Sequence, residues 1–271
     1  KRLVPGEDDR IRTIGSWLAI NARWMETHLS RRWRLNTNHL ILELVGVTFL
    51  GHILKWHPRS PIWRKKGVRM LIKELESQTL DGRNWEPTTA YHRFVLEAVL
   101  KLWISLEDKE RSSVFWKKIG MIIREKVDVL DWLTNQKGRI PLVGDDDGGI
   151  VIPRPFPYDV RDTSLVLGLA ESHGLRRNPD PIGIRIWRRH GTGVIRTEAA
   201  HLHIVAGAAK GLAEQAGHRH LDFLSLALSN NGEDIIMDSG TGIYFGNDEW
   251  RDFARTEAAH SGVFSGAKSW G

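Results

Sequence analysis

The sequence of 271 residues contains no cysteine. Disulfides and thiolate ligands are therefore excluded, and any bound metal ion must rest on histidine and carboxylate side chains. No stretch approaches the roughly 20 apolar residues that a membrane-spanning helix needs. The first ten residues, KRLVPGEDDR, also lack the apolar run of a secretory signal peptide.

Basic residues outnumber acidic ones, with 39 Lys and Arg against 33 Asp and Glu, a net charge of +6 and a pI near 9.6. This balance favours a polyanionic partner such as nucleic acid, an anionic membrane surface or an acidic glycan. The basic residues are scattered in short groups, which argues against nucleic acid. Examples are Arg31, Arg32 and Arg34; Arg64, Lys65 and Lys66; and Arg185, Arg188 and Arg189. The 12 tryptophans suit a core and also stacking on sugar rings.

Apolar residues recur with helical spacing through the first half of the chain. The pattern predicts helices over 10–28, 37–55, 61–79, 88–106, 111–136 and about 160–174. A long loop rich in Gly, Pro and Asp, KGRIPLVGDDDGGIVIPRPFPYD, precedes the last of these. Short alternating runs then follow, such as IRIW and LHIVAGA, which are typical of strands. We therefore expect a multidomain α+β chain with a helical domain at 1–176 and a β domain at 183–271.

A His/Asp motif stands at the start of one predicted strand, where His218, His220 and Asp222 occupy every second position before Leu224 and Leu226. Alternate side chains of a strand share one face, so we expect both imidazoles and the carboxylate on the inward face. Burial of such groups requires hydrogen bonds, ion pairing or a metal ion. The motif therefore predicts a metal or catalytic site, with a hydrogen-bonded histidine pair at a sheet end as the alternative.

The turn at 230–232 decides where Asp238 lies. With a three-residue loop, Leu224 faces Asp238, which then shares the face of His220 and Asp222. With a two-residue loop, Asp238 points away and is a turn residue. The sequence leaves both registers open.

A second group of candidates opens the helix NTNHLILELVGVTFL. Asn36 or Thr37 is the expected N-cap, so Asn38 and His39 project from the first turn. Glu43 follows His39 by four residues and is within its reach. Simple capping with a surface histidine is the alternative.

A third group lies in DGRNWEPTTAYHRFVLE. Thr88 or Thr89 is expected to cap the next helix, which places Tyr91, His92 and Arg93 in its first turn. The alternative is a capped helix with an aromatic side chain packed inward.

These motifs, in this order, resemble the heparinase II/III-like polysaccharide lyases. The resemblance covers most of the chain and is carried by NTNHLILELVGVTFLG, QTLDGRNWEPTTAYHRFVLE, PLVGDDDGG, GHRHLDFLSLALSNNGEDIIMDSGTGIY and RDFARTEAAHSGV. It implies an incomplete (α/α) toroid followed by an antiparallel β-sandwich that is truncated here. It also implies β-elimination of uronic-acid-containing glycans, a substrate class that favours a periplasmic or extracellular location.

The resemblance assigns catalytic roles to four residues. Asn38 and His39 match the Asn-His pair of the family's cleft, Tyr91 its catalytic tyrosine and His218 its β-domain histidine. β-Elimination must remove the C5 proton, stabilise charge on the carboxyl group and protonate O4. Asn38, with His218 or a nearby arginine, is expected to meet the carboxylate. Tyr91 is expected to act as acid, and His39 or Tyr91 as base according to the C5 epimer. A basic tyrosine requires its pKa, ordinarily about 10, to be lowered by neighbouring cations.

The resemblance also implies ligands. His220, Asp238 and His260 match the positions at which some members bind a structural zinc ion, and no organic cofactor is implied. The candidates for substrate binding are Glu86, Arg93 and Arg219. Strand alternation would instead turn Arg219 toward solvent.

Three other functions fit parts of the sequence. A non-catalytic protein that binds acidic glycans can use the same scaffold, and the basic charge fits nucleic acid. A glycoside hydrolase needs a spaced carboxylate pair, for which Glu43, Glu86 and Asp222 are candidates. The substrate remains open among heparin or heparan sulfate, other glycosaminoglycans, alginate and acidic exopolysaccharides.

Overall fold

The computed structural model describes residues 7–31, 37–207 and 217–264. By their internal contacts the residues form two compact units, Lys1–Ser77 with Leu102–Ile119, and Gln78–Lys101 with Gly120–Gly271. The boundaries between the two units fall within the helical half of the chain. The predicted domain boundary, near 176–183, instead follows the change from helices to strands. That boundary remains a prediction. Each unit is described by itself.

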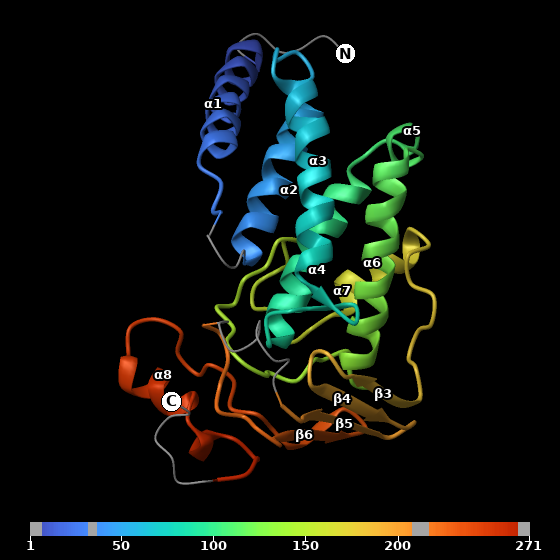
Figure 1. The fold of residues 1–271 in the computed structure, drawn as a ribbon, viewed down its shortest axis with the longest axis vertical. Helices are drawn as coiled ribbons and strands as arrows, with labels where there is room; N and C mark the ends of the chain where they lie inside the picture. The colour runs from blue at the N-terminus through green and yellow to red at the C-terminus, as the bar shows by residue number, and fades with distance from the viewer. Residues whose placement is uncertain (1–6, 32–36, 208–216, 265–271) are drawn as a thin grey trace. The chain divides into compact units, whose positions relative to one another are not determined.

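The first unit is built around α2, which lies between α1 and α3 (Figure 1). Its helices are α1 (Glu7–Thr27), α2 (Asn38–Ile53), α3 (Ser60–Ser77) and the short α5 (Asp108–Arg111). Leu40, Leu44 and Val47 of α2 are buried, so this helix supplies much of the unit's core. Gly67 of α3 faces Thr48 of α2 so closely that a methyl group there would overlap the threonine.

The second unit combines helices with two sheets. Its helical elements are α4 (Thr89–Ile104) and α6 (Val114–Leu133), each partly in the first unit, and α7 (Ser164–Ser172), α8 (Asp248–Ala254) and the 3-10 turn η2 (Glu257–Ala259). A small hairpin pairs β1 (Thr79–Leu80) with β2 (Arg83–Asn84) just before α4. The six helices predicted from apolar spacing are all present, with ends within three residues of prediction except at 160–174, where α7 begins four residues later.

The larger sheet has five antiparallel strands in sequential order. They are β3 (Gly183–Trp187), β4 (Thr192–Arg196), β5 (Ala200–Val205), β6 (Leu226–Asn230) and β7 (Glu233–Ile236). Trp187 and Val194 are buried on the inner face, whereas Ile184, Ile186 and Ile195 are exposed on the outer face. A sheet with apolar side chains on both faces is typical of β-sandwiches, in which a second sheet packs against one of these faces.

The prediction of a strand through the His/Asp motif is wrong. Residues 217–225 form turns and bends, and β6 begins only at Leu226. Ser225 donates its backbone N–H to the carbonyl of Asp222 at 2.9 Å, and Leu224 has a φ of 57°. A left-handed residue inside a tight turn is incompatible with extended backbone. Strand alternation therefore does not bring the motif's side chains together.

The β6–β7 hairpin settles the open register. Its loop has two residues, 231–232, both with positive φ (50° and 76°), as a type I′ turn requires. A register shift opposite Leu228 and Ser229 leaves Ile235 as an extra residue in β7. One extra residue reverses the alternation of side chains once. The bulge thus offsets the effect of the short loop, and Asp238 is buried rather than turned away.

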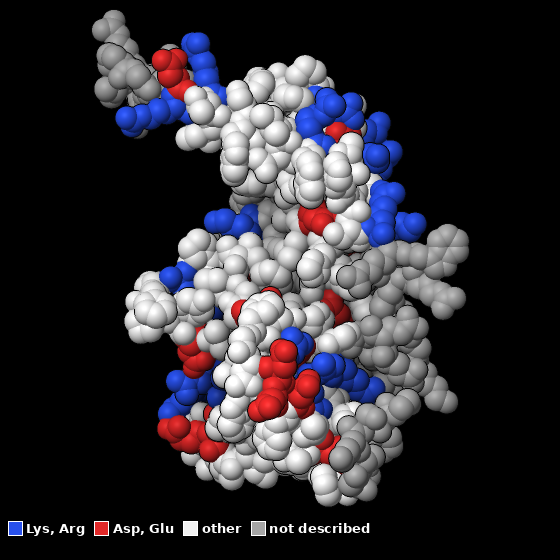
Figure 2. Space-filling model, turned by 90° about the vertical axis from the view of Figure 1, so that its left-hand side faces the viewer, with Lys and Arg blue, Asp and Glu red and all other residues white. Residues whose placement is uncertain are grey.

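None of the helices in the described part of the chain has the length and apolar character needed to cross a bilayer. On the face drawn in Figure 2, Lys and Arg form several separate groups, with Asp and Glu lying among them. This mixed surface agrees with the scattered basic residues of the sequence.

Candidate active site and metal site

Tyr91 stands in the first turn of α4, as predicted. Its backbone N–H donates to the hydroxyl of Thr88 at 2.9 Å, so Thr88 caps the start of the helix. The side chain of Tyr91 is largely buried, and its ring centroid lies 4.5 Å from that of His218. The tyrosine and the histidine, 127 positions apart in the chain, therefore share one site.

Burial raises the pKa of Tyr91, and a side-chain hydrogen bond with Tyr244 raises that pKa further. Negative charge on Asp147 acts in the same direction. Tyr91 therefore keeps its proton at neutral pH, which suits a proton donor. The lowered pKa that a basic tyrosine requires is not what this environment produces.

Asp145 organises the histidine side of the site. Its carboxylate accepts hydrogen bonds from Nδ1 of His218 at 3.2 Å, Nε2 of His220 at 2.9 Å and Nη2 of Arg251 at 2.7 Å. Burial alone would raise the pKa of Asp145, but the two histidine hydrogen bonds and the charge of Arg251 outweigh it and lower the pKa. The carboxylate is therefore ionised, although the side chain is fully buried.

Arg251 joins this group to Tyr244. The guanidinium lies over the ring of Tyr244 at 4.3 Å and also donates to its carbonyl at 3.3 Å. Sequence reasoning missed Asp145, Tyr244 and Arg251. The available signals were their places inside three of the family motifs, PLVGDDDGG, the β-domain signature and RDFARTEAAHSGV.

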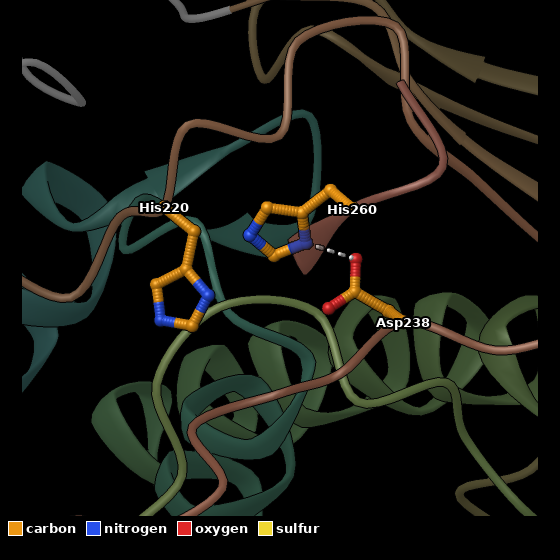
Figure 3. Close-up of side chains that lie close together, drawn as sticks. All are labelled: His220, Asp238 and His260. Atoms are coloured by element: carbon orange, nitrogen blue, oxygen red, sulfur yellow. Dashed lines mark hydrogen bonds and ion pairs between the residues drawn. The ribbon is translucent and has the colours of Figure 1, made fainter. Parts of the chain in front are cut away.

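His220, Asp238 and His260 form a compact triad (Figure 3). Each offers one ligand atom, and these atoms all lie within 4.8 Å of one another. The residues come from the segment before β6, the segment after β7 and the end of η2. Nδ1 of His260 donates to Asp238 at 3.0 Å, and Oδ1 of Asp238 also accepts from the backbone of Gly240.

Two histidine nitrogens of the triad are available to bind a metal ion. Nδ1 of His220 and Nε2 of His260 are buried and have no hydrogen-bond partner among residues 7–31, 37–207 and 217–264. The other nitrogen of each ring is held by a carboxylate, an arrangement that commonly orients metal-binding histidines. Asp222 is also buried here, and burial followed by the charge of Asp238 raises its pKa.

The predicted substrate-binding residues have different surroundings. Glu86 is buried, with a carboxylate oxygen 3.7 Å from Nε2 of His218. Arg93 is fully buried and donates to Glu97 at 2.6 Å and to the carbonyl of Gly149. Its guanidinium has no surface to offer a glycan, so this geometry does not support that prediction. Arg219 is partly exposed and stays a candidate.

Asn38 and His39 open α2 in the first unit, with Thr37 as the N-cap residue. Asn38 is buried and His39 is exposed. Glu43 accepts hydrogen bonds from the backbone and hydroxyl of Ser30, at 2.6 and 2.5 Å. The catalytic roles of Asn38 and His39 remain predictions from the resemblance.

Several solved structures share this fold. A crystal structure of heparinase III gives a TM-score of 0.74 at 16% identity, over 96% of this chain and 43% of its own. Heparan sulfate lyase HepC from Pedobacter heparinus gives 0.63 at 19% identity, over 89% and 38%. Another heparinase III gene product gives 0.65 at 18% identity, over 88% and 38%. The chain thus spans less than half the length of these proteins.

No curated protein matches the chain. Two family models match it in order: heparinase II/III N-terminus over residues 17–146, and heparinase II/III-like, C-terminal over residues 183–270. The helical part and the five-stranded antiparallel sheet agree with the heparinase III structure. The chain therefore belongs to the heparinase II/III-like family.

Proposed function

We propose that this chain is part of a polysaccharide lyase that cleaves a uronic-acid-containing acidic glycan by β-elimination. The contact between the rings of Tyr91 and His218, 4.5 Å apart, carries the proposal. It joins a tyrosine that keeps its proton to an imidazole held by a buried carboxylate. Membership of the family supports the class of enzyme, and the neighbours named heparinase III and heparan sulfate lyase agree with it.

Tyr91 acts as the general acid in this proposal. The leaving O4 needs a proton as its bond to C4 breaks, and a protonated phenol beside an imidazole supplies one. The raised pKa of Tyr91 supports this role over that of a base. His39 keeps its predicted role as the base that removes the C5 proton of one of the two C5 epimers.

His218 meets the uronate carboxylate, where negative charge develops as the C5 proton leaves. Its Nδ1 is occupied by Asp145, so Nε2 is the atom that faces substrate. To donate a hydrogen bond at this point, Nε2 must carry a second proton besides the one on Nδ1, and such a donor stabilises the developing charge. Asn38 keeps its predicted role as a second donor.

A zinc ion would be held by His220, Asp238 and His260. When bound, such an ion fixes the positions of its ligands and takes no part in proton transfer. Nitrogen and carboxylate ligands suit zinc. The residues themselves would then hold three separate segments of the second unit in place.

The substrate class is tested by presenting heparin, heparan sulfate, other glycosaminoglycans, alginate and acidic exopolysaccharides to the protein. β-Elimination leaves an unsaturated uronate that absorbs in the ultraviolet, and we expect this product from at least one polymer. Binding of a polymer without new absorbance would indicate a non-catalytic glycan-binding protein. New reducing ends without absorbance would indicate a hydrolase. Either outcome would refute the lyase.

A further inference from the structure

The carboxylate of Asp145 contacts both functional histidines. Oδ1 accepts from Nε2 of His220, and Oδ2 accepts from Nδ1 of His218 and from Arg251. Because the same carboxylate also accepts from the guanidinium of Arg251, its oxygens act as acceptors and each histidine is the donor. His218 therefore carries its proton on Nδ1, and His220 carries its proton on Nε2.

These opposite tautomers determine which nitrogen of each ring is left without a proton. The remaining nitrogen of His218 is Nε2, which lies on the side of Glu86, 3.7 Å away. The remaining nitrogen of His220 is Nδ1, which is buried without a hydrogen-bond partner in the described part of the chain and belongs to the triad. A single carboxylate thus presents one nitrogen to the tyrosine site and another to the metal site.

The backbone around Asp145 is held from both sides. Its own N–H donates to the carbonyl of His218 at 3.1 Å, and the N–H of Asp146 donates to the hydroxyl of Thr241 at 2.5 Å. Gly144 has a φ of 72°, and a methyl group on it would lie 2.8 Å from the carbonyl of Pro87 and 3.0 Å from that of His218. The carboxylate therefore has little freedom to move away from either ring.

We propose that Asp145 is a positioning residue that sets the tautomers of both histidines and thereby couples metal binding at the triad to the orientation of His218. The coupling to catalysis rests on the proposed lyase function. The coupling to the triad does not, because it concerns only the nitrogen that His220 offers a metal ion. Loss of the carboxylate should therefore weaken metal binding and turnover together.

The test compares Asp145→Asn with Asp131→Asn in the intact protein. Asp131 is a matched control, because its carboxylate is also buried in the second unit and accepts from Arg176 at 2.6 Å, but it contacts neither histidine. Long-range proton–nitrogen NMR at one fixed pH reports the tautomer of each ring, and competition with a chelator reports zinc affinity. The asparagine amide offers one acceptor and two donors, so it cannot hold both rings as the carboxylate does.

We expect Asp145→Asn to change the tautomer of at least one of the two histidines and to weaken zinc binding about 10–100-fold, the usual effect of losing such a partner. We expect kcat on a cleaved glycan to fall about a hundredfold with KM nearly unchanged. Asp131→Asn should keep the native tautomers and zinc affinity. Unchanged tautomers and zinc affinity in Asp145→Asn would overturn the proposal even if the native protein is an active lyase.

The outcome remains decisive in two other cases. If the native protein cleaves no glycan, the lyase fails, but the tautomer and zinc measurements still decide the role of Asp145. If Asp145→Asn does not fold, the native protein alone decides it, because a neutral His218 with its proton on Nε2 would contradict the proposed arrangement.

Discussion

The ring of Tyr91 lies 4.5 Å from the imidazole of His218, with the two planes tilted by 40°. Tyr91 lies in the first turn of α4, and His218 lies in an irregular segment before β6. Their contact places a tyrosine that keeps its proton beside an imidazole held by a carboxylate.

Removing the hydroxyl of Tyr91 tests the proton donor. We expect Tyr91→Phe to lower turnover at least about a hundredfold, the scale of losing a proton-transfer group. The loss of its hydrogen bond with Tyr244 should cost stability only about 1 kcal/mol. Tyr158→Phe is the control, because Tyr158 is exposed and packs against Phe156. Ultraviolet absorbance of the unsaturated product measures both, and similar rates for the two variants would refute the role.

Removing the imidazole of His218 tests the group that meets the uronate. We expect His218→Ala to lower turnover at least about a hundredfold. His173→Ala, at the exposed C-cap of α7, should leave turnover unchanged. Near-normal cleavage by His218→Ala would show that this histidine does not act on the substrate.

Metal content tests the triad. Protein purified without chelators should contain about one zinc ion per chain, and removal of the ion should lower the thermal midpoint, because a ligand that binds only the folded state stabilises it. His220→Ala and His260→Ala should each lose the metal, whereas His173→Ala should retain it. Elemental analysis that finds no zinc in the native protein would contradict the site.

Lys126 predicts a pH dependence of stability. Its amine is fully buried, has no hydrogen-bond partner among the described residues, and burial lowers its pKa from 10.5 to about 7. Between these values the unfolded chain binds a proton that the folded chain does not, so stability falls as the pH falls from 10.5 to about 7. The loss should be on the order of a few kcal/mol.

Lys126→Met should remove this loss. The variant should gain stability over the native protein as the pH is lowered toward 7, and the difference should become constant below that value. Lys117→Met, on the exposed side of the same helix, should follow the native protein. Urea unfolding at several pH values measures this. Parallel curves for native and Lys126→Met protein would exclude a neutral buried lysine.

A pair of glycines tests the packing beside Asp145. Gly144 and Gly148 have almost the same φ, 72° and 74°, but a methyl group would overlap backbone only at Gly144. We expect Gly144→Ala to destabilise the protein by about 1–3 kcal/mol more than Gly148→Ala does. Because both substitutions carry a similar penalty for positive φ, the difference between their urea midpoints measures the cost of the close contact at Gly144. Equal midpoints would mean that the loop can move aside.

The sequence predicted the helices and the place of Tyr91 well, because apolar spacing and capping act over a few residues. The pattern placed His220 in a metal or catalytic motif and left the position of Asp238 open, but His260 and the complete triad came only through the family resemblance. The contacts of Asp145 with His218 and His220 were missed, since they span 73 and 75 positions and arise from a loop without periodicity, so that only its place in a family motif marked it.

The strand prediction over the His/Asp motif failed for a local reason. Alternating polar and apolar residues favour extended backbone, but the left-handed Leu224 and the turn closed by Ser225 interrupt it. The motif's two histidines still converge, because they are held by one carboxylate and not by a shared strand face. No pattern in the sequence shows whether two histidines are brought together by a strand face or by a shared carboxylate.

The extra residue Ile235 makes the spacing of this hairpin matter more than its composition. Deleting one position between the turn and Asp238 would swing that carboxylate to the opposite side, away from His260, while many replacements of individual side chains would not. Related sequences should therefore tolerate amino-acid substitutions in this short stretch but should rarely contain insertions or deletions there.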